Sequence, residues 1–229
     1  MSRTRPLVAL LGVLLLGLLG CTKKNDSGGD LPAADGLLKA AAEDMRTVTT
    51  VRFVIEASGT VAGLALRRAE GVLTREGDAQ GKAQVEQFGT NIELEFIVKG
   101  SSMYIKGPTG GFQQVPLGLA STVYDPSAIL DPDKGVANLL ATATEGRTEA
   151  REAINGVDAY RVSAKLNTRA VSSLVPGVSG DITGQLWIGV DRPRLLKTTF
   201  AVPGQSGTAA GTVTITLSDF DAPVTINAP

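Results

Sequence analysis

The side chains that most often carry enzyme chemistry are scarce in this chain. Its 229 residues contain no histidine and a single cysteine, Cys21. A Ser-His-Asp triad, a histidine general base, a histidine-ligated zinc, a four-cysteine site and an internal disulfide are therefore excluded. No nucleophile elbow, dinucleotide fingerprint or phosphate-binding loop motif occurs in the sequence. We therefore expect neither an enzyme nor a cofactor, and no metal.

Two groups of acidic residues could be mistaken for chemical sites. Asp131 and Asp133 lie in a segment, 131–135, that faintly matches a calcium loop, but its glycine comes one position early and its third ligand is a lysine. We interpret these aspartates as helix caps. Glu93 and Glu95 alternate with apolar residues, which predicts that they lie on the solvated face of a strand rather than as a catalytic pair.

Cys21 has a clear chemical role, as an attachment site for lipid. Arg3 and Arg5 precede an apolar stretch, 7–19, that is too short to span a bilayer comfortably, and Leu18-Leu19-Gly20-Cys21 follows at the cleavage position. This is the pattern of a bacterial lipoprotein signal, whose new N-terminal cysteine is acylated. The alternative is an ordinary secretory signal with a free cysteine nearby.

The same pattern sets the expected domain organisation. Residues 1–20 are the expected signal peptide, 21–34 carry the lipidated cysteine and a polar, flexible tether, and 35–229 form a single domain. We expect the protein on the extracytoplasmic face of the cell membrane, held by its lipid anchor. Removal of Arg3 and Arg5 leaves 22 − 2 = 20 basic against 23 acidic residues, and aromatic residues make up only 4% of the chain. Such a chain offers no basic field or stacking platform for nucleic acid.

The mature chain begins with one expected helix and then changes to strand periodicity. Asp35 is the expected N-cap of a helix that runs to about Arg46, with apolar residues on one face. From Val51 onward apolar and polar residues alternate, as in a strand with one buried face. Glycine-containing turns at short intervals favour an antiparallel meander over βαβ crossovers. The strands expected in this half are 51–58, 68–74, 81–88, 92–99, 102–106 and 112–115.

The middle of the chain predicts short helices, and a second set of strands follows. Pro126 and Pro132 each follow an aspartate that can serve as an N-cap, and the second of these helices is expected over 132–143. Asn155-Gly156 predicts a tight hairpin, and one more short helix is expected over 168–174. The strands expected in this half are 145–154, 159–166, 181–190, 195–202 and 212–219.

These elements predict an α+β fold with about ten or eleven strands and three or four short helices. The sheet is long enough to curl, and its alternation gives it one apolar face that the helices are the obvious elements to cover. From the residues alone, this face is either a solid core or the wall of a cavity. The apolar side chains expected on it are Phe53, Ile55, Leu73, Ala83, Val85, Ile92, Leu94, Phe96, Met103, Ile105, Val162, Leu186 and Ile188, faced by Val136, Leu139 and Leu140 of a helix.

Several segments resemble the LppX/LprG family of mycobacterial cell-envelope lipoproteins. The likeness begins with the lipoprotein signal at Cys21, and its longest and most unusual part is the block from Val123-Tyr124-Asp125-Pro126 to Asn138-Leu139-Leu140. Gly146-Arg147, Ile154-Asn155-Gly156 and Pro223-Val224-Thr225 extend it over essentially the whole mature chain, which is nearer to the LprG members.

The resemblance implies a fold and a function. It implies a curved antiparallel half-barrel with short helices on its concave face, enclosing a hydrophobic cavity, with Ala83 at the cavity entrance. It also implies binding of acylated glycolipids or triacylglycerols and their transport across the cell envelope, together with a major-facilitator-type membrane transporter. The alternative is a structural or scaffolding lipoprotein whose sheet is a solid core and whose surface binds a protein partner.

The lipoprotein signal makes one direct prediction. Replacing Cys21 with Ala removes the only thiol that can be acylated, so the variant should carry no lipid. Metabolic labelling of cells with a fatty-acid analogue should mark the natural chain and leave Cys21→Ala unmarked. Labelling of both chains to the same extent would contradict the assignment of Cys21 as the anchor.

Overall fold

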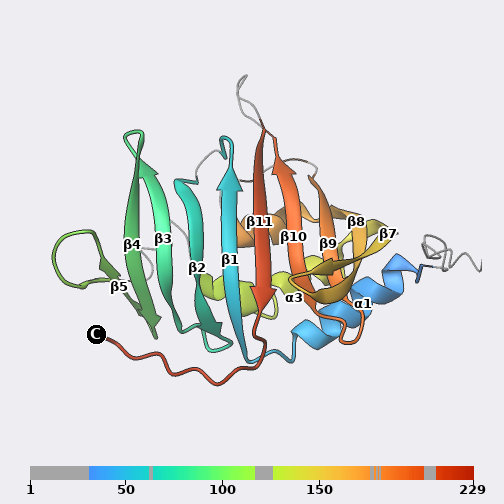
Figure 1. Ribbon diagram of the computed structural model, residues 1–229, viewed down its shortest axis with the longest axis horizontal. Coiled ribbons are helices and arrows are strands. Elements are labelled where there is room, and N and C mark those ends of the chain that lie inside the picture. The colour runs from blue at the N-terminus through green and yellow to red at the C-terminus, as the bar shows by residue number, and fades with distance from the viewer. Residues whose placement is uncertain are drawn as a thin grey trace, which may run out of the picture. The chain divides into compact units, whose positions relative to one another are not determined.

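The domain is built around one 11-stranded antiparallel sheet in the order β6-β5-β4-β3-β2-β1-β11-β10-β9-β8-β7 (Figure 1). The computed structural model describes residues 31–61, 64–116, 126–175, 178, 180, 182–203 and 210–229. Two meanders, β1 to β6 and β7 to β11, are joined where β1 pairs with β11. The expected antiparallel meander is confirmed, and the antiparallel pairing of neighbouring strands extends through the whole sheet.

The strands lie close to their expected positions. In the first meander they are β1 (Thr50–Ser58), β2 (Leu66–Thr74), β3 (Ala79–Gln87), β4 (Thr90–Lys99), β5 (Ser102–Lys106) and β6 (Gln113–Pro116). In the second they are β7 (Thr144–Ile154), β8 (Val157–Leu166), β9 (Ile182–Gly189), β10 (Leu195–Val202) and β11 (Gly211–Ser218).

The helices are α1 (Ala34–Met45), the 3-10 helix η1 (Pro126–Leu130), α3 (Val136–Thr142) and α4 (Thr168–Leu174). Two expected caps are wrong. The N-cap of α1 is Ala33 rather than Asp35, which lies in the first turn, where its charge favours the helix dipole. Asp131 does not begin a helix at Pro132; its carboxylate accepts bonds from the backbone N–H groups of Asp133 and Lys134, at 2.9 and 3.0 Å, in a local turn.

Buried apolar residues and more exposed residues alternate along the strands, so the sheet has two different faces. We call the buried apolar face the inner face and the other the outer face. On β1, Phe53 and Ile55 are fully buried on the inner face, while Arg52 and Glu56 are exposed on the outer face. The inner face of the sheet and the apolar sides of the helices form one core cluster. The register keeps apolar residues opposite each other, as where Ile55 pairs with Ile215.

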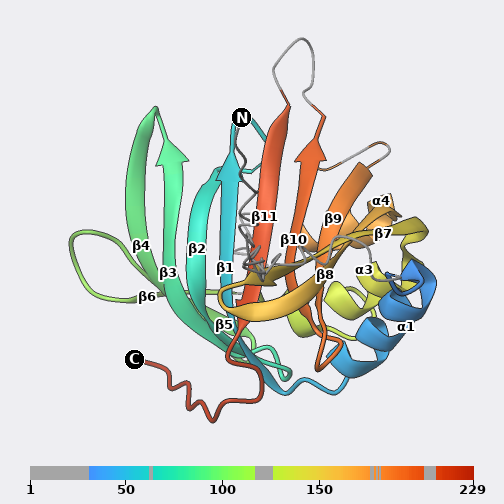
Figure 2. The same ribbon diagram turned by 45° about the vertical axis from the view of Figure 1, so that its right-hand side comes forward.

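The helices gather on the inner face over one part of the sheet. Helix α1 contacts β7, β9 and α3, while α4 and η1 contact each other and η1 also contacts β2. Figures 1 and 2 show this helical layer beside the half of the sheet that ends in β7, with β3 and β4 extending away from it. Within the described residues, no helix is both long and apolar enough to cross a membrane.

A pair of glycines allows β2 and β3 to approach unusually closely. Gly71 and Gly81 are direct partners on the inner face, in the row that also holds Phe53 and Phe96. A Cβ at Gly71 would overlap the carbonyl oxygen of Gln80 and lie 2.9 Å from the Cα of Gly81. Since real Cβ atoms essentially never come this close to backbone, only glycine fits here, and the two strands can bend against each other.

Gly71→Ala should therefore destabilise the fold. Overpacking of this kind typically costs about 1–3 kcal/mol, and here the obstacle is backbone rather than a side chain that can rotate away. Chemical denaturation measures the free energy of unfolding. Gly36→Ala in α1 is the matched control, because a Cβ there meets nothing within 4 Å, and it should stabilise by about 0.4–1 kcal/mol. Equal stability of Gly71→Ala and the natural chain would contradict the close approach.

An ionic clasp fixes the C-terminal end of α1 to the sheet. Arg194 is only 4% exposed and follows the β9–β10 turn. Its Nε donates to Asp44 of α1 at 2.6 Å, and its Nη2 donates to Asp221 at 2.6 Å. Asp221 also accepts from the backbone N–H and the hydroxyl of Thr49, at 2.9 and 3.1 Å. The clasp thus joins α1, the start of β1, a hairpin turn and the segment after β11.

Because of the clasp, the free energy of unfolding depends on pH in the acid range. Burial favours the neutral form of Asp221, but the Thr49 N–H and the Arg194 guanidinium outweigh it and lower the pKa of this carboxyl below its ordinary value of 3.8. Because the folded-state pKa is the lower one, the ionised carboxylate stabilises the fold fully above about pH 3.8, and this stabilisation is lost as the pH falls through the folded-state pKa.

Asp221→Asn should therefore lower the free energy of unfolding at pH 7 by about 1–2 kcal/mol, since the carboxylate is partly exposed and water screens it. The deficit should shrink below about pH 3.8. Denaturation of both chains at pH 7, 5 and 3 measures the difference. Asp219→Asn is the control, because its ion pair with Arg52 leaves both side chains more than half exposed (54% and 53%), and it should change stability by less than about 1 kcal/mol. A deficit that is the same at all three pH values would contradict the clasp.

Candidate functional site

Most of the apolar residues predicted for the inner face lie deep in the core. Their side chains come from β1, β2, β4, β5, β8, β9 and α3, and none is more than 7% exposed. They are Phe53, Ile55, Leu73, Phe96, Met103, Val136, Leu139, Leu140, Val162, Leu186 and Ile188. The structure therefore brings these predicted residues together in one cluster, between the sheet and the helical layer.

The remaining predicted residues form an accessible apolar strip on the same face. They are Ala83, Val85, Ile92, Leu94 and Ile105, and all five are half-buried. The strand register makes the strip continuous, because Ala83 pairs with Leu94 and Val85 with Ile92.

The apolar strip leads directly into the core. Ala83 pairs with Ala69, which pairs in turn with the fully buried Ile55. Burial thus decreases along a single row of the inner face, from β1 under the helices to β4 away from them. An apolar surface of this kind, half open to solvent and joined to a core, suits an apolar ligand.

One polar atom interrupts the buried part of the inner face. Thr198 of β10 is fully buried, lies between its partners Leu186 and Ile215, and has no hydrogen-bond partner for its hydroxyl within the described chain. A buried hydroxyl without a partner is unfavourable, because it has given up its bonds to water. The inner face is otherwise apolar around it, so shape and burial rather than charge decide what this face can hold.

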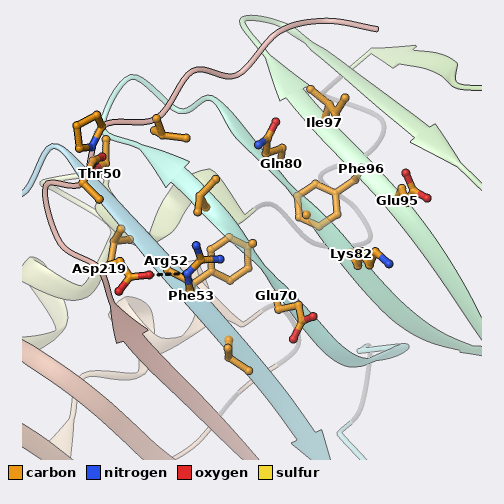
Figure 3. A pocket seen from close by; sticks show the side chains of 18 of the residues that line it. Thr50, Arg52, Phe53, Glu70, Gln80, Lys82, Glu95, Phe96, Ile97 and Asp219 are labelled. Carbon is orange, nitrogen blue, oxygen red and sulfur yellow. Dashed lines mark hydrogen bonds and ion pairs between the residues drawn. The ribbon is translucent and has the colours of Figure 1, made fainter. Parts of the chain in front are cut away.

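The outer face carries a groove of about 860 Å³ that the sequence did not reveal (Figure 3). Its floor is the backbone row of Phe53, Gly71, Gly81 and Phe96. Two rows of outer side chains flank that floor, and the segment after β11 and Phe112 close its ends. The flanking rows are Arg52, Val72, Gln80 and Ile97 on one side and Val54, Glu70, Lys82 and Glu95 on the other.

Charges along the groove are largely paired. Arg52 donates to Asp219 at 2.6 Å, and Lys106, beside the groove, donates to Glu95 at 3.3 Å. Lys82 lies 3.6 Å from Glu93. The groove therefore offers alternating charges with apolar patches rather than a field of one sign. Val54, Val72 and Ile97 are apolar at outer positions, among polar and charged neighbours, and they are the signal in the sequence that could have pointed to it.

The acidic candidates behave as surface residues. Glu93 and Glu95 both lie on the outer face in ion pairs with lysines, as expected. Over the ranges that the structure describes, no group of three or more His, Cys, Asp or Glu side chains could hold a metal ion. Cys21 lies outside the described residues, so its acylation stays a prediction.

Fold and site together define a class: an open, curved antiparallel half-barrel with short helices on its concave face and an accessible apolar strip beside them. The chain matches the family model described as LppX_LprAFG lipoprotein over residues 33–226, and it belongs to this family. The expected family and the expected fold class are thus confirmed.

Individual relatives agree with this assignment. The chain is 32% identical over 241 residues to a protein of Mycolicibacterium smegmatis named lipoarabinomannan carrier protein LprG, covering 99% of both chains. The crystal structure of LprF from Mycobacterium bovis superposes with a TM-score of 0.74 at 26% identity, covering 88% of this chain and 99% of LprF. The structure of the Mycobacterium tuberculosis lipoprotein LppX superposes with a TM-score of 0.65 at 20% identity, covering 87% of this chain and 100% of LppX. This second likeness supports the fold alone.

Proposed function

We propose that this protein is a lipid-anchored carrier that binds the acyl chains of lipids against the inner face of its sheet and moves them across the cell envelope. The observation that carries the proposal is the continuous apolar row that runs from Ile55, under the helices, to the half-buried Ala83 and Leu94. The anchor is Cys21, which holds the domain on the extracytoplasmic face of the cell membrane.

Burial of acyl chains supplies enough free energy without any ionic contact. Each buried methylene contributes about 0.8 kcal/mol, so two long chains contribute on the order of 20 kcal/mol of gross transfer energy. In this proposal the chains enter over the apolar strip and extend beneath α1, α3, α4 and η1, which contact one another as a layer. The buried predicted residues then line the loaded cavity, and Ala83 lies at its entrance.

The cargo in this proposal is an acylated glycolipid or a triacylglycerol, handed on to or from a major-facilitator-type transporter. The name of the LprG relative, a lipoarabinomannan carrier, supports the glycolipid. Apolar walls discriminate weakly between acyl chains, so the polar part of the lipid must decide specificity.

A second function, scaffolding by a solid domain that binds a protein partner, draws support from the outer-face groove. That groove is large, about 860 Å³, and mixes paired charges with apolar patches, as protein interfaces do. The two functions place their sites on opposite faces of the same strands, which makes them separable by mutation.

Ala83→Trp tests the carrier function. If Ala83 lies at an open entrance, the indole should block lipid entry and leave the melting temperature nearly unchanged, because it occupies accessible space. In a solid core the same change should lower stability by roughly 1–3 kcal/mol. Native mass spectrometry should record the bound lipid, and thermal melting should be measured on the same preparation.

The neighbouring residue supplies a matched control. Gln84 is exposed on the outer face of the same strand, so Gln84→Trp adds the same ring on the other side and should leave lipid occupancy intact. Ala83→Val should have a mild effect. An Ala83→Trp protein that melts early yet retains its lipid would overturn the entrance, and a natural chain that never carries lipid would favour the scaffold.

A further inference from the structure

Phe88 is the most exposed large apolar side chain among the described residues, with a relative exposure of 100%. It lies at the tip of the β3–β4 hairpin, where Gln87 pairs with Thr90 and only Phe88 and Gly89 form the turn. Both turn residues have positive φ, 51° and 76°, as a type I′ turn requires. A bulky aromatic residue is strongly disfavoured in this left-handed conformation.

The chain itself shows what such a turn ordinarily contains. The β7–β8 hairpin closes with Asn155 and Gly156, whose φ values are 51° and 83°. Asn-Gly is the preferred pair for this turn, because asparagine tolerates the left-handed region. Phe88 thus adopts the same φ as Asn155 with a side chain that gains nothing from folding, since it buries none of its surface. The aromatic ring is therefore explained by a contact outside the folded domain.

The surroundings of Phe88 indicate what that contact is. Val85 and Ile92, the last apolar pair before the turn, belong to the half-buried apolar strip that continues into the core. Gln87, Thr90 and Asn91, next to the turn, are uncharged. The nearest charge on β3, Glu86, is paired with Arg67, whose Nε donates at 2.8 Å. The hairpin tip can therefore move out of water into an apolar environment without desolvating an unpaired charge.

We propose that the Phe88 hairpin tip inserts into the interfacial layer of a lipid bilayer and places the apolar strip against the acyl chains there. Lipid then passes from the bilayer along Val85 and Ile92 to Ala83 and Leu94, so Phe88 sets the rate of loading. This inference rests on the proposed carrier function and adds to it the route by which cargo enters.

One aromatic side chain is enough only because the domain is tethered. Twelve residues lie between Cys21 and Ala34, and the thirteen Cα-to-Cα steps from one to the other reach at most roughly 47 Å at about 3.6 Å per residue. The anchor thereby holds the hairpin at a high effective concentration near the bilayer surface. A weak, reversible insertion is what a carrier needs, since permanent insertion would stop transport.

The experiment uses the full acylated chain in phosphatidylcholine vesicles. The rate at which a fluorescent diacyl lipid passes from the vesicles to the protein is compared for the natural chain, Phe88→Asn, Phe88→Leu and the control Val157→Ser. Val157 is 49% exposed beside the other hairpin turn. Phe88→Trp is examined separately for quenching of its fluorescence by brominated phosphatidylcholine, against the buried Trp187 of the natural chain.

The Phe88→Asn variant should take up lipid about tenfold more slowly, because the transfer free energy of one buried aromatic ring corresponds to a rate change of about that size. Its melting temperature should stay the same or rise, because asparagine suits the turn. Phe88→Leu should restore most of the rate, Val157→Ser should match the natural chain, and Phe88→Trp should be quenched. Unchanged loading by Phe88→Asn, or slower loading without quenching of Phe88→Trp, which would indicate a protein contact, would overturn the proposal. A natural chain that takes up no lipid from vesicles or from micelles would instead refute the carrier function itself.

Discussion

The fold depends on one constraint: an 11-stranded sheet has a longer apolar face than its few short helices can cover. A sheet in water must bury one face, and the longest helix among the residues that the structure describes, α1, has 12 residues. The helices gather on the inner face, where they contact β2, β7 and β9. On β3 to β5 only the apolar strip of Ala83, Val85, Ile92, Leu94 and Ile105 stays half open to solvent, while Phe96 and Met103 are buried. The carrier function proposed for the protein uses this half-buried strip.

Two local features stabilise this partly covered sheet. The Gly71 and Gly81 pair lets β2 and β3 approach where side chains would collide, so the sheet can bend beside the helical layer. The Arg194 clasp fixes the C-terminal end of α1, whose N-terminal end packs near β7. One end of the helical layer is thus held by the ion pairs of the buried Arg194 with two partly exposed aspartates, while the side toward β3 is bounded by half-buried apolar side chains.

Much of this architecture could be predicted from the sequence, because strand alternation is a strong signal. Phe53, Ile55 and Leu186 were placed on the inner face by period alone, and the register confirms them. Helix starts were predicted less well. Asp131 was expected to cap a helix, yet a Cβ at Gly135 would lie 2.6 Å from the carbonyl oxygens of Ala128 and Asp131, so the chain turns tightly there and α3 begins only at Val136.

The outer-face groove and the apolar strip could not be predicted for another reason. Both depend on how far each face is covered, and coverage is set by tertiary packing rather than by residue type. Ala83 and Leu73 have the same alternation in the sequence, but one is half-buried and the other fully buried. Likewise, the exposure of Phe88 follows from a turn conformation that its residue type disfavours.

The pairing of β1 with β11 has a consequence for how the chain folds. Arg52 and Ser218 are partners at the centre of the sheet, although they lie 166 positions apart in the chain. Each meander forms from sequence neighbours, but their junction requires the last strand, and such distant contacts form slowly. Until β11 arrives, β1 and β10 present two unpaired edges in the middle of the domain. A nascent chain therefore cannot complete its sheet until its C-terminal end has been synthesised and can reach the N-terminal half.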